Sequence, residues 1–277
     1  YAQLCPDHAQ TCGVDGVQTT YLDFPLRQPA LDLYESPDYG VTITSIGCPM
    51  RCKYCASGKL WPQYGKRFID EVIDEVSFQA GISSVKDMAF YDDALLMDKE
   101  RHFYPLCERL KEGFSDLRFH TSNGLHVREI DELCARYLFK TGFKTIRLSF
   151  EGTDPAVQRA SSDKVCNSQY VKAVENLLNA GYCLEDLETY ILVGLPGQSY
   201  ESVKKAILFV KSLGATVKLA EYSPIPGTAM FEECAKNFPQ LRTEPLYQNN
   251  TAYCGYMTPN ITQNQLQELK DLANSRK

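Results

Sequence analysis

The sequence predicts an α/β fold: a partial β/α barrel of six units, followed by a small helical extension at the C-terminus. Short β-rich runs alternate with segments of helical periodicity over most of the chain. Polar or glycine-containing motifs follow each β-rich run. The alternation ends at a proline-rich turn, Ser223–Gly227, and the 277 residues suffice for one large domain or two small ones.

Six runs are expected to be strands, and helical segments fill the gaps between them. The expected strands are Val41–Ile46, Asp87–Tyr91, Leu117–Thr121, Thr145–Phe150, Glu188–Val193 and Val217–Tyr222. Helical spacing of apolar residues marks Ile69–Val76, Val171–Leu178 and Val203–Val210, and helices are also expected near Glu100–Lys111 and Arg128–Phe139. Because a crossover helix or a closing segment follows each strand, the strands should be parallel, with their C-terminal ends on one rim.

An open doubly wound sheet and a β/α barrel both fit this alternation. In a barrel, the loops after all strands converge over one mouth. In an open sheet, functional loops cluster mainly at a switch point. The polar motifs after all six strands favour the barrel.

Beyond the proline-rich turn, the pattern predicts two further helices. One runs from about Thr228 to Ala235, and the last begins with the capping-box pair Thr262 and Gln265. We expect the apolar stripe of the last helix to seal one side of the domain. The expected division is an N-terminal tail and linker (1–40), the barrel (41–225) and a C-terminal extension that closes it (226–277).

Composition limits the classes of partner. The net charge of −6 and the pI near 5.4 argue against binding to nucleic acid by electrostatics alone. No apolar run approaches the roughly 20 residues that a membrane-spanning helix needs, so we expect no membrane segment.

Three of the eleven cysteines, Cys48, Cys52 and Cys55, crowd into one loop after the first expected strand. The other eight are scattered, and most should be small buried residues. Zinc would need a fourth ligand, and neither the single cysteines nor the four histidines form a second pair. Three cysteines suit a 4Fe–4S cluster that has one open iron, and Gly47 and Gly58 would let the backbone fold closely around the sulfurs.

This CxxxCxxC motif, with the aromatic Tyr54 before its third cysteine, resembles the radical S-adenosylmethionine (SAM) superfamily over roughly residues 41–225. The resemblance implies that the open iron binds the amino and carboxylate groups of SAM. Electron transfer from the reduced cluster then cleaves the S–C5′ bond, and the resulting 5′-deoxyadenosyl radical abstracts hydrogen from the substrate. It also implies a low-potential donor such as flavodoxin or ferredoxin, and a cytoplasmic protein of an anaerobic or microaerobic cell.

The same resemblance assigns cofactor contacts to the first rim motifs. Asp92 and Asp93 match a contact to the SAM amino group, although Asp93 could instead cap the next helix. Asn123 is a candidate cofactor or substrate contact, or simply part of an Asn-Gly turn.

The fourth and fifth strands carry the other expected contacts. Ser149 and Glu151 should share one face of a strand and suit the hydroxyls of a ribose, unless Glu151 merely pairs with Arg147 or Lys164. We favour Lys164 over Arg159 for the SAM carboxylate. On the adenine side, the resemblance implies that Ile191 or Val193 packs on the ring and that Gly194 lets the backbone approach closely.

Two segments resemble the branch of the superfamily that has an N-terminal cobalamin-binding domain. They are the turn Ser223–Gly227 and residues 1–20, which resemble the end of such a domain. The chain begins with Tyr1 rather than Met, so we expect that a further segment preceded it. Cobalamin is therefore a candidate third cofactor.

The expected function is radical modification, for example methylation, of an unactivated carbon in an unidentified small molecule or peptide. Methylthiotransfer is an alternative, but Cys5 and Cys12 alone do not supply the second cluster that it would need. An iron–sulfur electron-transfer or scaffold protein is the alternative from another class. It would gain nothing from the polar residues around the mouth.

Overall fold

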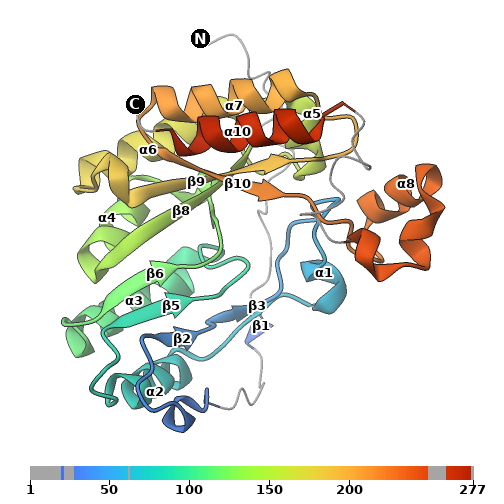
Figure 1. Cartoon of the computed structure of the whole chain (residues 1–277). Helices are drawn as coiled ribbons and strands as arrows, with labels where there is room; N and C mark the ends of the chain where they lie inside the picture. Colours follow the sequence, from blue (N-terminus) through green and yellow to red (C-terminus); the bar gives the residue numbers. More distant parts are fainter. Residues whose placement is uncertain (1–19, 22–27, 62, 249–259, 276–277) are drawn as a thin grey trace.

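The computed structural model describes residues 20–21, 28–61, 63–248 and 260–275 (Figure 1). Its centre is a seven-stranded parallel sheet with the order β10-β9-β8-β6-β5-β2, and β7 pairs with β8 beside this path. The strands are β2 (Gly40–Thr42), β5 (Asp87–Phe90), β6 (Arg118–Thr121), β7 (Leu125–His126), β8 (Phe143–Glu151), β9 (Leu187–Val193) and β10 (Thr216–Glu221).

All six expected strands are present, and their spatial order follows the chain without reversal. A doubly wound sheet would reverse its order at a switch point, so the architecture is that of a partial β/α barrel. Among the described residues β2 and β10 form the two ends of the sheet, which is open between them.

The first expected strand, Val41–Ile46, is split in two. Gly40–Thr42 joins the main sheet, whereas β3 (Ser45–Ile46) pairs with β4 (Gly65–Lys66), which also pairs with β1 (Thr20–Tyr21). The Thr44 N–H donates to the carboxylate of Asp92 instead of to a neighbouring strand. This side-chain bond ends the ladder at the point where the chain turns toward the cysteine loop.

Helices follow the strands and cover the outer face of the sheet (Figure 1). They are α2 (Ile69–Ala80), α3 (Tyr104–Gly113), α4 (Glu132–Thr141), α6 (Asn167–Ala180), α7 (Tyr200–Ser212) and α10 (Gln263–Asn274). Three further helices of the described chain lie outside this layer: α8 (Ala229–Asn237) and the short α1 (Ser57–Leu60) and α5 (Pro155–Ala160). A π-helical turn (Lys99–Phe103) precedes α3, and 3₁₀ turns span Leu31–Leu33, Val127–Glu129, Leu184–Asp186, Pro239–Arg242 and Pro245–Gln248. The short helices α1 and α5 were not expected, because four to six residues are too few to show a helical period.

The helix expected near Arg128 begins later in the structure. Val127–Glu129 forms a 3₁₀ turn, and α4 begins after Asp131, whose side chain accepts a hydrogen bond from the Cys134 N–H at 2.7 Å. This N-cap decides where the helix starts.

The apolar core lies between the sheet and its helices. Phe90, Phe119 and Phe143 contact one another there at ring-centroid distances of 5.2–5.9 Å. A second apolar cluster joins α8 to the end of β9 through Leu192, Leu195, Tyr222, Met230 and Phe231, with other residues around them.

The last helix starts as the sequence predicts. The Thr262 hydroxyl accepts from the Gln265 N–H, and the Gln265 side chain accepts from the Thr262 N–H. Leu266 and Leu269 enter the main core, and α10 lies along α7 (Figure 1). No helix in the described part of the chain is long and apolar enough to cross a bilayer.

Candidate functional site

The three clustered cysteines line one cavity of about 480 Å³. Their loop leaves β3 and ends where α1 begins, and α1 lies on the side of the molecule where α8 lies (Figure 1). Trp61 and Tyr64 also line the cavity, together with Thr228 at the start of α8.

Hydrogen bonds fix this loop between two distant parts of the chain. The Lys53 N–H donates to the Ala160 carbonyl at 2.9 Å, and the Lys53 carbonyl accepts from the Met230 N–H at 3.0 Å. The Cys52 thiol donates to the Ser161 carbonyl at 3.4 Å, and the Cys55 sulfur accepts from the Ser57 N–H at 3.4 Å. The end of α5 and the start of α8 therefore anchor the middle of the cysteine loop at Cys52 and Lys53.

Of the two glycines expected to permit this fold, Gly47 has a backbone conformation that favours glycine. Its φ is +76°, and a Cβ atom there would lie 3.1 Å from the Trp61 Cβ. Gly58 lies in α1, and a Cβ atom there would meet no other atom within 4 Å. Gly58 also lines the cavity of the cysteines, so its expected role in letting the backbone fold closely around the sulfurs stays a prediction.

The thiols suit a cluster better than a single ion. No three His, Cys, Asp or Glu side chains among the described residues converge as single-ion ligands do. A four-iron cluster is wider than one ion, so its ligands need not converge on a point. Three thiols on one loop fit a cluster that keeps one iron open, whereas the described residues do not gather the set of single-ion ligands that tetrahedral zinc needs.

Burial favours the protonated forms of the Cys48 and Cys55 thiols. It raises the pKa of the Cys48 thiol to about 12, although a backbone hydrogen bond from Met50 opposes it, and it also raises the pKa of Cys55. Because a metal binds the thiolate form of cysteine, Cys48 and Cys55 would release their protons on binding one.

The remaining described cysteines partly follow the expectation of burial. Cys107, Cys134 and Cys234 are buried, Cys166 is half-buried and Cys183 is exposed. Cys5, Cys12 and Cys254 lie outside the described residues, as do nearly all of residues 1–20.

A buried ion pair lies beside the cysteines. The Lys164 Nζ is 2.6 Å from the Glu151 Oε1, and each side chain is 7% exposed. Burial lowers the pKa of Lys164, but the charges of Glu151 and Cys52 outweigh it, so the pKa lies above its usual value. The pair therefore presents fixed opposite charges next to the thiols.

Tyr54 lies at the same place. Its hydroxyl donates to the Ser161 Oγ at 3.4 Å, and its ring packs on the second apolar cluster. Burial, and then the charge of Glu151, raise the pKa of Tyr54 above its usual value, so the phenol stays neutral.

The two aspartates after β5 have different partners. The buried Asp92 carboxylate accepts from the Thr44 N–H at 3.1 Å, the Thr44 hydroxyl at 2.7 Å and the Ser45 hydroxyl at 2.5 Å. The exposed Asp93 accepts from the Ser57 hydroxyl at 2.5 Å. The next helical turn starts at Lys99, so Asp93 does not cap it.

Asn123 and Ser149 lie where strands approach one another closely. The Asn123 Nδ2 donates to the carbonyls of Tyr91 and Asp92 at 3.0 and 3.2 Å and so joins the ends of β5 and β6. Ser149 is buried against Gly124.

Ser149 and Glu151 do not keep the simple alternation that the two-residue spacing implied. Ser149 pairs with Tyr190 and Glu151 with the next residue, Ile191, so the register shifts at Phe150. Glu151 also has a φ of +69°. The bulge and the left-handed residue redirect Glu151 toward Lys164, so a common face no longer follows from the spacing.

The residues expected on the adenine side lie in two different environments, the apolar core and the turn after β9. Ile191 and Val193 are fully buried in the helix-covered core, whereas Leu192 between them packs on the second cluster with Tyr222. Gly194, with a φ of +91°, follows the strand, and its N–H donates to the Gln198 Oε1.

Two residues of the site were not singled out from the sequence. Gln198 accepts from the N–H groups of Gly194 and Leu195 and donates to the Leu192 carbonyl, which fixes the turn after β9. His126 lies with its Nε2 4.0 Å from the Cys48 Sγ, and burial, then the charge of Lys164, lower its pKa to about 3. The Gly-Leu-Pro-Gly turn before Gln198 is a sequence motif that could have drawn attention to this residue, whereas no motif marks His126.

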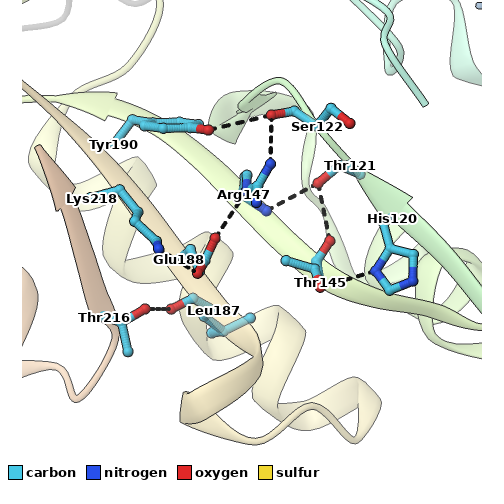
Figure 2. Close-up of polar contacts among 10 residues, drawn as sticks. All are labelled: His120, Thr121, Ser122, Thr145, Arg147, Leu187, Glu188, Tyr190, Thr216 and Lys218. Carbon is cyan, nitrogen blue, oxygen red and sulfur yellow. Dashed lines mark hydrogen bonds and ion pairs between the residues drawn. The ribbon is translucent and has the colours of Figure 1, made fainter. Parts of the chain in front are cut away.

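A polar row crosses the face of β6, β8, β9 and β10 that is turned away from the helices (Figure 2). Arg147 donates to Glu188 at 2.9 Å and to the Ser122 carbonyl at 3.0 Å, and Lys218 lies 3.3 Å from Glu188. His120 contacts the Thr145 hydroxyl at 3.0 Å. A cavity of about 410 Å³ lies against this row, so a polar ligand could be accommodated there.

The sequence matches known proteins over most of its length. The family described as the Radical SAM superfamily matches residues 42–210. An uncharacterized methyltransferase of Pyrococcus horikoshii is 28% identical over 206 residues, which are 72% of this chain and 42% of that protein. A tRNA-2-methylthio-N(6)-dimethylallyladenosine synthase of Sulfurihydrogenibium is 25% identical over 199 residues, 69% of this chain and 45% of that protein.

Solved structures share the fold at lower identity. The methyltransferase TsrM of Kitasatospora setae, bound to tryptophan and a SAM analogue, has a TM-score of 0.61 at 19% identity, over 72% of this chain and 39% of that one. Methylornithine synthase has a TM-score of 0.57 at 14% identity, over 85% of this chain and 61% of that one. The chain spans less than half the length of the two curated relatives and of TsrM.

Proposed function

Because the chain belongs to the radical SAM superfamily, we propose that it is the barrel of an enzyme that modifies its substrate by radical chemistry. Cys48, Cys52 and Cys55 would hold a 4Fe–4S cluster, and SAM would bind at the open iron. When bound, these two cofactors supply the one-electron cleavage that yields a 5′-deoxyadenosyl radical. The observation that carries the proposal is the cavity shared by the three thiols, with the buried Glu151–Lys164 pair beside it.

In this proposal, the ion pair orients SAM. Lys164 would attract the carboxylate of SAM, and Glu151 with Ser149 would accept from ribose hydroxyls. The two charges are already desolvated and held 2.6 Å apart, so little reorganisation is needed when the ligand binds.

In this proposal Asp93 would contact SAM, whereas Asp92 would have a structural role. Asp93 is exposed, and its charge acts on the Cys55 thiol, so it is the carboxylate better placed to receive the SAM amino group. Asp92 is bonded to Thr44 and Ser45, and its part would be to fix the chain that leads into the cysteine loop. Asn123 would hold the adjacent strand ends.

The adenine side of the site would be the end of β9. The side chains of Ile191 and Val193 are in the core, so these residues would contribute through the backbone that leads to Gly194. The second apolar cluster, with Tyr54 beside it, would keep water away from the cofactors.

The reaction that we favour is methyl transfer to an unactivated carbon of a small molecule or peptide. The curated relative from Pyrococcus is named a methyltransferase, and TsrM is a methyltransferase whose structures include cobalamin. Cobalamin is therefore a candidate further cofactor. The enzyme would need a low-potential electron donor such as flavodoxin or ferredoxin and would work in the cytoplasm of an anaerobic or microaerobic cell.

Methylthiotransfer is the second candidate, because one relative is a tRNA methylthiotransferase. Iron analysis of the reconstituted chain bears on this candidate. Two clusters per chain would favour it, whereas one cluster agrees with both candidates, because the chain spans only 45% of that relative.

The test is an anaerobic assay for 5′-deoxyadenosine after reconstitution with iron and sulfide and addition of SAM and dithionite. The variant Cys48→Ala/Cys52→Ala/Cys55→Ala should give no product. The matched control Cys166→Ala/Cys183→Ala, which removes two cysteines away from the loop, should behave like the wild type. A wild-type chain that holds a complete 4Fe–4S cluster yet forms no 5′-deoxyadenosine would refute the proposal.

A further inference from the structure

We propose that His126 donates a hydrogen bond to the sulfur of Cys48 when that sulfur binds iron, and that this bond raises the reduction potential of the cluster. This role depends on the cluster of the proposed function but not on SAM cleavage. It makes His126 a positioning and tuning residue rather than a ligand.

The fold brings His126 to the cysteine loop through a close approach of two strands. Leu125 and His126 form β7 and pair with Leu148 and Ser149 of β8. Gly124 permits this, because a Cβ atom there would lie 3.1 Å from the Ser149 backbone nitrogen and closer still to its hydroxyl. The result is a distance of 4.0 Å between the His126 Nε2 and the Cys48 Sγ, across 78 residues of sequence.

The His126 imidazole has no other hydrogen-bond partner among the described residues. The His126 side chain is buried, with 6% of the residue exposed, and its Nδ1 has no hydrogen-bond partner in that part of the chain. A buried polar group without a partner costs free energy, so such a group is seldom kept for packing alone. Among the described residues His102 is also buried with an unpartnered Nδ1, but its Nε2 contacts the Arg67 carbonyl at 3.0 Å and not a cysteine sulfur.

The chemistry of the sulfur sets the direction of the bond. A thiolate that binds iron carries no proton and can only accept, so Nε2 must be the protonated nitrogen of the ring. Hydrogen bonds to cluster sulfurs stabilise the reduced form, which carries one more negative charge, and thereby raise the reduction potential. Lys164 also lies nearby, but an uncharged substitution at His126 leaves its charge in place.

The experiment is an EPR-monitored redox titration of the reconstituted full chain. His126→Phe keeps a ring of similar size without a donor, and His126→Gln keeps an N–H donor. His120→Phe is the matched control, because His120 contacts Thr145 and Asp87 and no cluster cysteine. We expect a more negative midpoint potential for His126→Phe, a potential nearer to the wild type for His126→Gln, and no shift for the control.

The role is overturned if His126→Phe, with full iron and sulfide content, keeps the wild-type potential, or if His126→Gln shifts as far as His126→Phe. Should His126→Phe fail to assemble a cluster, pulsed EPR of the reduced wild type labelled with ¹⁵N-histidine decides. A histidine nitrogen coupling that disappears in His126→Gln or is altered there supports the bond, and its absence from the wild type refutes it. A wild type without any cluster would refute the proposed function itself.

Discussion

At the residue scale, the site depends on the Glu151–Lys164 pair, which combines burial with backbone strain. An ion pair between Glu151 and Lys164 was one of the alternatives that the sequence left open, since two side chains thirteen residues apart can come into contact at the end of a strand. The positive φ of Glu151 was not predictable, because left-handed glutamates have no sequence signature. The role of His126 was equally hidden, because only the pairing of β7 with β8 brings it to Cys48.

The first prediction concerns the cost of breaking this pair. Lys164→Met leaves the Glu151 carboxylate buried without its partner, which should lower the free energy of unfolding by about 3–5 kcal/mol. The double variant Glu151→Gln/Lys164→Met removes both charges and should be less destabilised. Urea unfolding measures both, and equal losses in the two variants would show that the charges are solvated.

The second prediction concerns acid stability. The Arg118 hydrogen bond, with help from His120, holds the pKa of Asp87 at about 2, below its usual value near 3.9. Because the folded pKa is lowered, the stabilisation is fully present above about pH 4 and is lost as the pH falls toward 2. Asp87→Asn should therefore be less stable than the wild type at pH 6, and the difference should shrink between pH 4 and pH 2. A difference that is independent of pH would contradict the assignment.

At the element scale, periodicity predicted the six strands and the long helices, because each buries a regular apolar face. Periodicity did not predict two details of the strands. The Asp92 carboxylate takes the Thr44 N–H and splits the first strand, and the bulge at Phe150 shifts the register of β8. Both depend on contacts between distant segments, which a local pattern does not contain.

The turn after β9 gives the third prediction. Gln198→Leu removes the acceptor for two backbone N–H groups and the donor to the Leu192 carbonyl, all of them buried. Leaving buried groups unpaired costs about 1–3 kcal/mol for each, so the variant should be clearly destabilised, and SAM should bind more weakly at the shifted Gly194. Ser202→Ala in the following helix serves as a control in thermal unfolding and SAM titration. Wild-type behaviour of Gln198→Leu in both measurements would exclude this role for the turn.

At the scale of the whole molecule, the unreversed strand order is what brings the site together. The C-terminal ends of the parallel strands β5, β8 and β9 lie at one rim, where Asp92 and Asp93, Glu151 of the ion pair and the Gly194 turn are found. The place of the proposed cluster is predictable from the cysteine spacing, because its three proposed ligands are local in sequence. The polar row of Arg147, Glu188 and Lys218 could not be predicted, since it depends on the register of three strands.

The most direct test of the central claim is the EPR spectrum of the reduced cluster before and after addition of SAM. If Cys48, Cys52 and Cys55 leave one iron open, SAM will bind that iron and change the g values of the signal. We expect that change in the wild type and a much weaker one in Glu151→Gln/Lys164→Met at the same SAM concentration. A complete 4Fe–4S cluster in the wild type whose spectrum ignores SAM would contradict the claim that this chain is the barrel of a radical SAM enzyme.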